Sequence, residues 1–519
     1  MMPESSTEHP ADRGESQSRK LSGHEVLFPP LPYDIKERAE RAGSDIHLQQ
    51  FINTFTYRKQ QAREQALADA FGANTDAIRE LAGAIKQHTL DHLDYYLERF
   101  IAEAESKGTT VHIALDSDQA RQTTVSIASE HKCQLCVKSK SMVTEEIQLV
   151  PALEMVGCET VETDLGEFVI QLDQDAPSHI VTPMIHKDRK DAARAFQREL
   201  GASYTEDPEE LTRIARNYLR DKYRRADLGV SGANFLVAET GSIVLCSNEG
   251  NARFCTSVPK VHVAIVGIEK LVPRLEHLSV FLKVLARSST GQPLTSYTHT
   301  ITGPKRTEEH DGPEQVHVIL VDNGRTELLK KSTRELLRCI RCGACLNVCP
   351  VYRKIGGHAY GSVYSGPIGA ALTPLMRGLA NYSDLPHASS LCGACYEACP
   401  VKIDIPRQLI RLRHEMVKNR VTGLADRLFY RFWGLSLCSV WSYRLGAWIQ
   451  RRSLRRQAYQ NGSLSSGDPY AARGWVKKAR GMLGGWTSQR HLPTPTQNSF
   501  HQWWIQSRSK TDADPIDLD

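Results

Sequence analysis

Two cysteine runs constrain this chain more strongly than any other feature of its sequence. The first run spaces four cysteines by two, two and three residues and ends in Cys-Pro: Cys339, Cys342, Cys345 and Cys349. The second spaces three cysteines by two and three residues and also ends in Cys-Pro: Cys392, Cys395 and Cys399. In bacterial two-cluster ferredoxins, three cysteines of such a run hold one iron–sulfur cluster and the fourth holds the other. The two runs therefore predict two [4Fe–4S] clusters with exchanged ligands.

The exchange assigns four thiolates to one cluster and three to the other. Cluster 1 is expected to be held by Cys339, Cys342, Cys345 and Cys399. Cluster 2 is expected to be held by Cys349, Cys392 and Cys395. When the runs are aligned on their prolines, the missing fourth ligand falls at Ser389. The fourth iron of cluster 2 then has a non-cysteine ligand, is open, or is absent as in a [3Fe–4S] cluster.

Structural zinc is the competing interpretation, because soft thiolates select zinc as well as iron–sulfur clusters. Zinc sites take tetrahedral sets of four Cys or His ligands, whereas two runs that end in Cys-Pro are typical of clusters. Residues 368–380, between the runs, are apolar with helical spacing. This pattern predicts an α-helical ferredoxin-type domain.

Composition indicates the cellular compartment in which the chain is expected to work. Thirteen cysteines without an apolar signal peptide favour metal or redox chemistry in a reducing compartment over a disulfide framework. No run approaches the roughly 18 apolar residues of a membrane-spanning helix. The net charge of +5 is too small to indicate nucleic-acid binding. We therefore expect a cytoplasmic protein.

Composition and hydrophobic periodicity divide the sequence into five segments. Residues 1–45 are rich in Ser, Glu, Pro and His and are predicted to be disordered. Residues 46–106 have helical periodicity, residues 107–325 form an α/β domain, and residues 326–418 form the two-cluster domain. Residues 419–519 begin with a basic segment and continue into a Ser/Gly/Pro-rich tail that is expected to be flexible.

The α/β assignment rests on short apolar runs that alternate with helical patterns. Helices are expected over 118–131 and 189–200. Strands are expected over 111–115, 133–137, 155–161, 179–185, 235–238, 243–246, 261–266 and 316–321. Alternation of this kind predicts a mostly parallel sheet that is covered on both faces.

The remaining cysteines and a histidine pair carry weaker signals. Cys133 and Cys136 could form a redox dithiol, but buried strand cysteines are common and the core interpretation is favoured. The same interpretation applies to four others: Cys158, Cys246, Cys255 and Cys438. His88 and His92 lie one helical turn apart and could share a metal, but no third ligand is evident, which favours a solvated or packed pair.

The segment 429–456 is basic and contains tryptophan. Between residues 420 and 480 there are twelve Lys and Arg against two Asp. Such a segment fits the inner face of the cytoplasmic membrane or a partner subunit. A simple amphipathic packing helix is the alternative interpretation.

Three stretches together resemble the B component of the lactate-utilisation system. They are residues 85–90, residues 228–273, and the two cysteine runs with the sequence around them. The resemblance covers roughly residues 50–450. It implies a LUD domain with a fold similar to the sugar-phosphate isomerase and CoA-transferase superfamily, followed by a domain with two [4Fe–4S] clusters. Three cysteines at the second cluster are the pattern of that family, so Ser389 is no departure from it.

The resemblance also implies a function. The chain is expected to act with an A and a C component and to pass electrons from the oxidation of L-lactate to pyruvate to a downstream acceptor. No flavin or nicotinamide motif is evident, because the glycines at 356, 357 and 361 do not follow a strand into a helix. The chain is therefore not expected to be catalytic alone.

Two other classes of function are alternatives to electron transfer. A CoA-transferase-like or isomerase-like enzyme could use Glu239 or Glu249, which lie close to glycines, as a carboxylate nucleophile. The simpler interpretation is that both are turn residues. A cluster-based sensor is disfavoured because no DNA-binding motif is evident.

Overall fold

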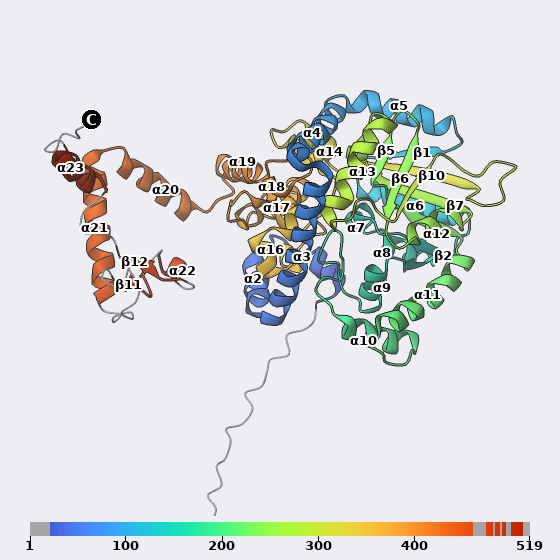
Figure 1. The fold of residues 1–519 in the computed structure, drawn as a ribbon, viewed down its shortest axis with the longest axis horizontal. Helices are drawn as coiled ribbons and strands as arrows, with labels where there is room; N and C mark the ends of the chain where they lie inside the picture. The colour runs from blue at the N-terminus through green and yellow to red at the C-terminus, as the bar shows by residue number, and fades with distance from the viewer. Residues whose placement is uncertain (1–20, 460–473, 481–482, 488–489, 495–499, 512–519) are drawn as a thin grey trace, which may run out of the picture. The chain divides into compact units, whose positions relative to one another are not determined.

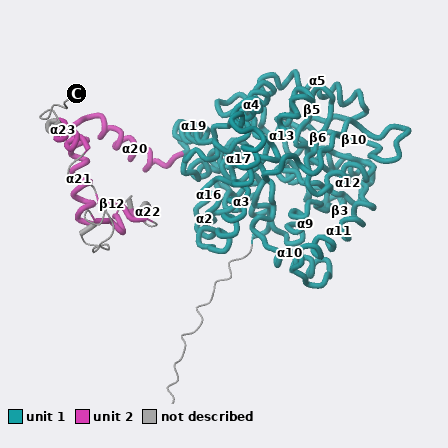
Figure 2. The backbone as a smooth tube through the Cα atoms, viewed as in Figure 1, with its two compact units in different colours: residues 1–421 teal, residues 422–519 magenta. Residues whose placement is uncertain are grey.

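The computed structural model describes residues 21–459, 474–480, 483–487, 490–494 and 500–511. The chain divides into two compact units, and the boundary along the sequence falls between Val421 and Thr422 (Figure 2). We call them the main unit and the C-terminal unit. The main unit contains both the α/β region and the cysteine runs, so these regions share one folded body.

A six-stranded parallel sheet forms the centre of the α/β region (Figure 1). In spatial order its strands are β1 (Thr110–Ala114), β10 (Gln315–Val321), β7 (Val261–Gly267), β4 (Leu228–Ser231), β2 (Leu135–Lys138) and β3 (Glu159–Glu162). The inner strands read almost continuously apolar, as in VHVAIVG of β7, because both of their faces are buried. The predicted α/β class is confirmed.

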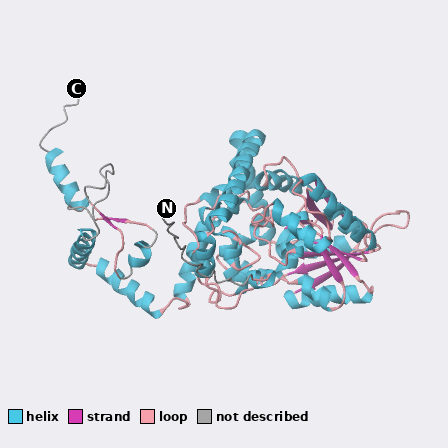
Figure 3. Ribbon diagram, turned by 90° about the horizontal axis from the view of Figure 1, so that it is seen from below, coloured by secondary structure: helices cyan, strands magenta, loops and turns pink. Residues whose placement is uncertain are grey.

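Successive side chains of these strands point to opposite faces of the sheet and pack in two different cores. Val263 and Ile265 pack with α6 (Ser117–Glu130) and α8 (Leu149–Met155) on one face. Ala264 packs with α5 (Leu93–Glu105) on the other. Figure 3 shows helices above and below the sheet. Further helices of the α/β region are α7 (Met142–Glu146), α9 (Leu165–Leu172), α10 (Arg189–Leu200), α11 (Pro208–Arg225), α12 (Asn251–Ser257), α13 (Leu275–Ser289) and α14 (Arg325–Leu329), with the short η2 (Ile268–Lys270).

A second, four-stranded sheet was not expected from the sequence. Its order is β8 (Leu271–Val272), β5 (Phe235–Val237), β6 (Ser242–Ser247) and β9 (Tyr297–Ile301). Strand β6 pairs antiparallel with both β5 and β9. Leu236 and Ile243 pack with the core of the main sheet, whereas Val244 packs with the core around the cysteine runs. The second sheet therefore lies between the first sheet and the cysteine region.

The N-terminal helices close over the cysteine region. They are α1 (Gly23–Leu27), α2 (Ile35–Ser44), α3 (Ile46–Phe71), η1 (Gly72–Asn74) and α4 (Thr75–Asp91). Residues 1–45 were predicted to be disordered, whereas the structure folds residues 23–44 into α1 and α2. A capping box at Ser22 begins α1, and Leu27 and Ile35 are buried. Residues 1–20 lie outside the described part of the chain.

The cysteine region consists of short helices joined by tight loops. They are η3 (Arg334–Arg338), α15 (Ala344–Asn347), α16 (Pro350–Ile355), η4 (His358–Tyr360), α17 (Gly366–Arg377), η5 (Leu385–His387), α18 (Ala394–Ala398) and α19 (Ile405–Lys418). The expected ferredoxin-type region is helical, as predicted.

One expected strand is wrong. Residues 179–185 form turns rather than a strand. The ring Nδ1 of His179 accepts hydrogen bonds from the amides of Val181 (3.0 Å) and Thr182 (3.1 Å). The backbone therefore turns around its own side chain and cannot pair with a neighbouring strand.

The C-terminal unit contains α20 (Leu424–Leu437), α21 (Val440–Tyr459), β11 (Trp475–Val476), α22 (Leu483–Thr487), β12 (Leu492–Pro493) and α23 (Phe500–Thr511). Its small core holds Leu454, Val476 and Ala479. The flexible tail expected from residue 462 onward falls partly outside the described residues. No helix in the described part of the chain is both long and apolar enough to span a bilayer.

A buried ionic network joins the α/β region to the cysteine region. Arg325, which follows β10, donates two hydrogen bonds of 2.9 Å to the carboxylate of Glu146 and one of 2.6 Å to Glu269. Tyr364, from the cysteine region, donates to Glu146 at 2.6 Å. Arg341, beside Cys342, lies 3.5 Å from Glu269. Burial alone would raise the pKa of Glu269, but Arg325 and Arg341 outweigh it and lower that pKa to about 2.

This network predicts a large effect of the variant Arg325→Met. Glu146 and Glu269 would stay buried without their main counter-charge, so we expect the free energy of unfolding to fall by about 3–5 kcal/mol. Calorimetry of the full chain should record a lower Tm. The control Arg334→Met breaks the partly exposed pair with Asp91 and should cost at most about 1 kcal/mol. Equal effects of the two variants would contradict a central role for Arg325.

Candidate iron–sulfur centre and the adjoining cavity

The two cysteine loops share one backbone conformation. Arg341 and Gly343, on either side of Cys342, have φ of 60° and 74°. Leu391 and Gly393, on either side of Cys392, have φ of 54° and 86°. Left-handed residues on both sides curl each loop around its cysteine, and glycine adopts such a φ at little cost. The cysteines of the second run therefore correspond to the last three of the first.

The cysteines gather in two groups, and each group mixes the two runs. The first group lines one small cavity with apolar walls: Cys339, Cys342, Cys345 and Cys399. The second is evident from electrostatics, because burial together with the nearby Cys349 and Cys392 raises the pKa of Cys395 to about 12. Cys395, of the second group, also contributes to the raised pKa of Cys345, of the first, so the two groups are neighbours.

The spacing of the sulfurs distinguishes zinc from a cluster. Within the described residues, three Cys, His, Asp or Glu ligand atoms lie within 4.8 Å of one another only at Asp175, His186 and His358. All seven cysteines of the runs are described, so no three of their sulfurs lie that close. Zn–S bonds of about 2.3 Å place the sulfurs of a tetrahedral site about 3.8 Å apart. No three of these cysteine sulfurs are therefore as close together as a tetrahedral zinc site requires.

Backbone amides support the sulfurs. The amide of Arg341 donates to Cys339 Sγ (3.4 Å), that of Tyr352 to Cys349 Sγ (3.4 Å), and that of Ile403 to Cys399 Sγ (3.3 Å). Hydrogen bonds to thiolate sulfur stabilise its negative charge and tune the potential of a cluster.

Ser389 occupies the place in the second loop that Cys339 has in the first. The amide of Leu391 donates to Ser389 Oγ at 3.1 Å. The amide of Arg341 makes the corresponding bond to Cys339 Sγ, also two residues back. The second group is also nearer to solvent, because Cys392 is exposed whereas Cys342 is buried.

Two arginines from the N-terminal helices position the second cysteine run. Arg79, buried on α4, donates to the carbonyls of Cys399 (3.1 Å) and Glu397 (2.6 Å). Arg63, on α3, donates to the carbonyl of Glu397 at 3.2 Å. These contacts bring the second run against the first, which sequence spacing could not reveal.

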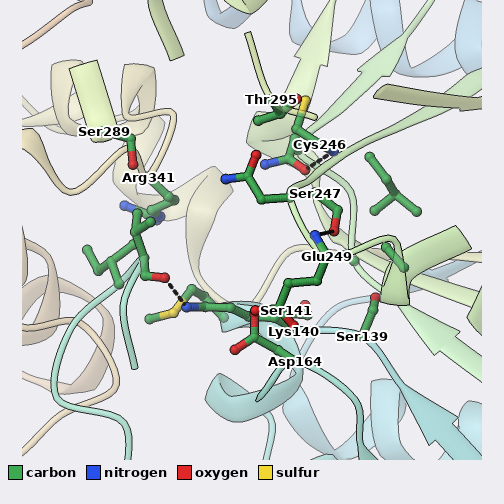
Figure 4. A pocket seen from close by; sticks show the side chains of 18 of the residues that line it. Ser139, Lys140, Ser141, Asp164, Cys246, Ser247, Glu249, Ser289, Thr295 and Arg341 are labelled. Carbon is green, nitrogen blue, oxygen red and sulfur yellow. Dashed lines mark hydrogen bonds between the residues drawn. The ribbon is translucent and has the colours of Figure 1, made fainter. Parts of the chain in front are cut away.

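A cavity of about 490 Å³ adjoins the first group of cysteines. It opens where β2, β4 and β7 end, and Arg341 and Cys342 form part of its wall (Figure 4). Carboxyl ends of parallel strands are common ligand-binding positions. No sequence pattern indicates this cavity, because its lining comes from loops that are distant along the chain.

The two candidate carboxylates have different positions. Glu249 lines the cavity, accepts a hydrogen bond from the amide of Leu165 (3.0 Å), and has its pKa raised to about 7 by burial and by Asp164. Glu239 instead accepts from the amide of Leu275 (3.0 Å) and does not line the cavity. Of the pair, only Glu249 is placed to meet a ligand there.

The other cysteines mostly match the packing interpretation. Four are buried within the α/β region: Cys133, Cys136, Cys158 and Cys255. Cys246 is partly buried in the wall of the cavity. Cys438 is exposed, so its assignment to packing is wrong. His88 shares a 3.0 Å hydrogen bond with the hydroxyl of Tyr96, which accounts for one ring nitrogen without a metal.

Sequence reasoning missed the group of Asp175, His186 and His358. Its members are far apart in sequence, so no spacing pattern could have indicated it. His186 Nε2 lies 3.3 Å from Asp175 Oδ2, and Lys187 Nζ lies 2.7 Å from the same oxygen. Because a lysine already neutralises this carboxylate, the group is a less suitable metal site than its composition suggests.

Comparison with known proteins agrees with this two-part architecture. Residues 97–321 match the model of the LUD domain, and residues 335–403 match the model of the 4Fe-4S dicluster domain. A crystal structure of a DUF162 family protein from Deinococcus radiodurans aligns at 14% identity over 44% of this chain and 98% of that chain. The TM-score of that alignment is 0.26.

Full-length relatives are much more similar. "Lactate utilization protein B" of Shouchella clausii (strain KSM-K16) is 42% identical over 480 residues, which cover 92% of this chain and 98% of that protein. The protein of the same name in Bacillus cereus (strain AH820) is 44% identical over 438 residues, which cover 84% and 89% of the two chains. With its LUD domain and 4Fe-4S dicluster domain, the chain belongs to the lactate utilization protein B family.

Proposed function

We propose that this chain is the iron–sulfur electron-transfer subunit of a lactate-utilisation complex. It would receive electrons from the oxidation of L-lactate to pyruvate and pass them to a downstream acceptor, with the A and C components of that system as partners. The observation that carries the proposal is the gathering of seven thiols into two neighbouring groups, each drawn from both runs. The relatives' name and the dicluster match support it.

The proposed ligand sets follow the two groups. Cluster 1 is assigned to Cys339, Cys342, Cys345 and Cys399, which line one cavity. Cluster 2 is assigned to Cys349, Cys392 and Cys395, with Ser389 beside its fourth corner. When bound, the two clusters supply one-electron transfer.

Residues of the chain make the surroundings of the two proposed clusters different. Lys86, Lys270 and Arg341 are buried near Cys339, where their positive charge favours added negative charge at cluster 1. Cys392 is exposed, so the second group is where a partner can approach most closely. We therefore propose that cluster 2 faces the electron-transfer partner.

A second candidate function depends on Glu249. A carboxyl group with a pKa near 7 in a cavity could serve a CoA-transferase-like or isomerase-like enzyme. The wall shared with Cys342 favours a redox role for the same cavity. The variant Glu249→Gln distinguishes the two, because it should abolish acyl transfer or isomerisation and leave the clusters reducible.

We also propose that the C-terminal unit contacts the membrane surface. Helix α20 buries none of its residues within the described part of the chain, which disfavours a simple packing role. Its exposed aromatic side chains include Phe432 and Trp433, and α21 exposes Trp441 and Trp448. Arginines interleave with them, as in helices that lie on anionic lipid surfaces.

Metal content tests the central proposal. Anaerobic reconstitution with iron and sulfide should load about seven to eight iron atoms per chain, because a [4Fe–4S] pair holds eight and one corner lacks a thiolate. Elemental analysis should find zinc far below one atom per chain. The control Cys255→Ser, at a buried cysteine outside the runs, should keep its iron. One or two zinc atoms and no iron would overturn the proposal.

The two clusters should differ in stability towards air. An iron without a thiolate is held less tightly, so cluster 2 should lose iron first and give a three-iron EPR signal. Ser389→Cys should suppress that signal, whereas the control Ser383→Cys, six residues earlier in the same segment, should not. Cys399→Ser should weaken cluster 1. If Cys399→Ser damaged only the air-sensitive cluster, the crossed assignment would have to be exchanged.

Membrane contact should appear as co-sedimentation of the cluster-loaded full chain with lipid vesicles. We expect binding to phosphatidylcholine vesicles that contain phosphatidylglycerol, with weaker binding to pure phosphatidylcholine and at high salt. Trp433→Ser combined with Trp441→Ser should reduce binding severalfold. Tyr204→Ser, at an exposed aromatic of the main unit, is the control. Failure to bind either vesicle would assign this surface to a partner subunit instead.

A further inference from the structure

The inner end of the 490 Å³ cavity contains two largely buried basic side chains, and one of them has a buried donor without an acceptor among the described residues. Lys270, at 7% exposure, has neither a hydrogen bond nor an ion pair with any described residue. Arg341, at 9% exposure, leaves its buried Nη1 without a hydrogen-bond partner in the described part of the chain. Buried donors without acceptors are costly, and native proteins generally keep them where a ligand supplies the acceptor.

The charge around these two residues is also unbalanced. The described side chains of the network are two arginines and two lysines against two carboxylates: Arg325, Arg341, Lys86 and Lys270 against Glu146 and Glu269. Burial lowers the pKa of Lys86 to about 7 and that of Lys270 to about 8, and an anion beside them would restore their charge. Arg325 engages both carboxylates, while Glu269 Oε1 makes no hydrogen bond with any described residue and lies 3.5 Å from Arg341 Nη2. The nearby thiolate of Cys339 offsets part of the excess, but no hydrogen bond joins it to Lys270 or to Arg341 Nη1 in the described structure. The cavity end therefore remains attractive to an anion.

The remaining walls suit an organic molecule. Met142, Ile180 and Leu285 supply apolar surface, and Ser139 has a buried hydroxyl without a partner among the described residues. Figure 4 shows Arg341 and Ser289 on one side of the cavity and Glu249 on the other. A volume of 490 Å³ lies within the usual range for small-molecule sites. Glu249 and Asp164 line another part of the cavity, where Lys140 offsets some of their negative charge.

We propose that this cavity binds a small organic anion, whose carboxylate or phosphate group is held by Lys270 and Arg341. The site is distinct from the proposed cluster ligands but shares a wall with Cys342. An anion there would repel electrons added to cluster 1 and shift its potential downward. By reciprocity, reduction of cluster 1 would weaken binding of the anion. The LUD domain would thus couple the occupancy of its cavity to the first cluster.

Calorimetry of the cluster-loaded full chain with pyruvate, and separately with inorganic phosphate, tests the proposal. We expect saturable binding of at least one probe; pyruvate binding indicates a carboxylate ligand and phosphate binding indicates a phosphate ligand. Lys270→Gln should weaken binding about tenfold to a hundredfold, because it removes a charged donor. The matched control Lys283→Gln, on the exposed side of α13, should bind as the unmodified chain does. Binding of neither probe, or equal binding by Lys270→Gln, would overturn the proposal.

A redox titration followed by EPR supplies a second measurement. At a concentration that saturates the unmodified chain but not Lys270→Gln, the probe should lower the potential of cluster 1 in the unmodified chain and shift it much less in the variant. An equal shift in both proteins would show that the probe acts elsewhere and would overturn the site. The calorimetric result does not depend on electron transfer from lactate, so the cavity proposal and the proposed function can fail separately. The melting temperature of Lys270→Gln verifies that the variant folds.

Discussion

The main unit depends on the buried carboxylates of Glu146 and Glu269 and on the arginine between them. Arg325 uses three of its donors on these two groups, all within 2.9 Å. Charges removed from water are tolerated only when such geometry compensates them. Because Tyr364 and Arg341 join the same network from the cysteine region, the α/β sheet and the cluster loops cannot be arranged independently.

This constraint explains why the cysteine loops form part of a larger core. Helices α3 and α4 contribute Arg63 and Arg79, which bind backbone carbonyls around the second run. The second sheet packs one face on the main sheet and the other near the first run. Cysteines that are distant in sequence are thus brought into two mixed groups. Burial also raises the pKa of these thiols, so their deprotonation depends on a metal core that compensates the negative charge.

The position of the cavity gives the LUD domain a direct connection to the cluster region. In a parallel sheet the loops at the carboxyl ends of the strands are free to form a ligand site. Here one wall of that site is the loop carrying Arg341 and Cys342. The basic side chains of Lys270 and Arg341 are therefore at the boundary between the two domains. A molecule bound at this boundary would contact both the LUD domain and the cysteine region.

The sequence by itself determined the ligand chemistry, because the Cys-x-x-Cys spacings and the Cys-Pro ends are local properties of the chain. It also determined the α/β class and most strands, such as β7, since continuous apolar runs require burial on both faces. It could not show that residues 179–185 turn around His179, that Cys399 lies beside Cys342, or that Glu249 but not Glu239 reaches a cavity. Those outcomes depend on contacts between segments that are far apart in sequence, and only the tertiary structure decides which of them form.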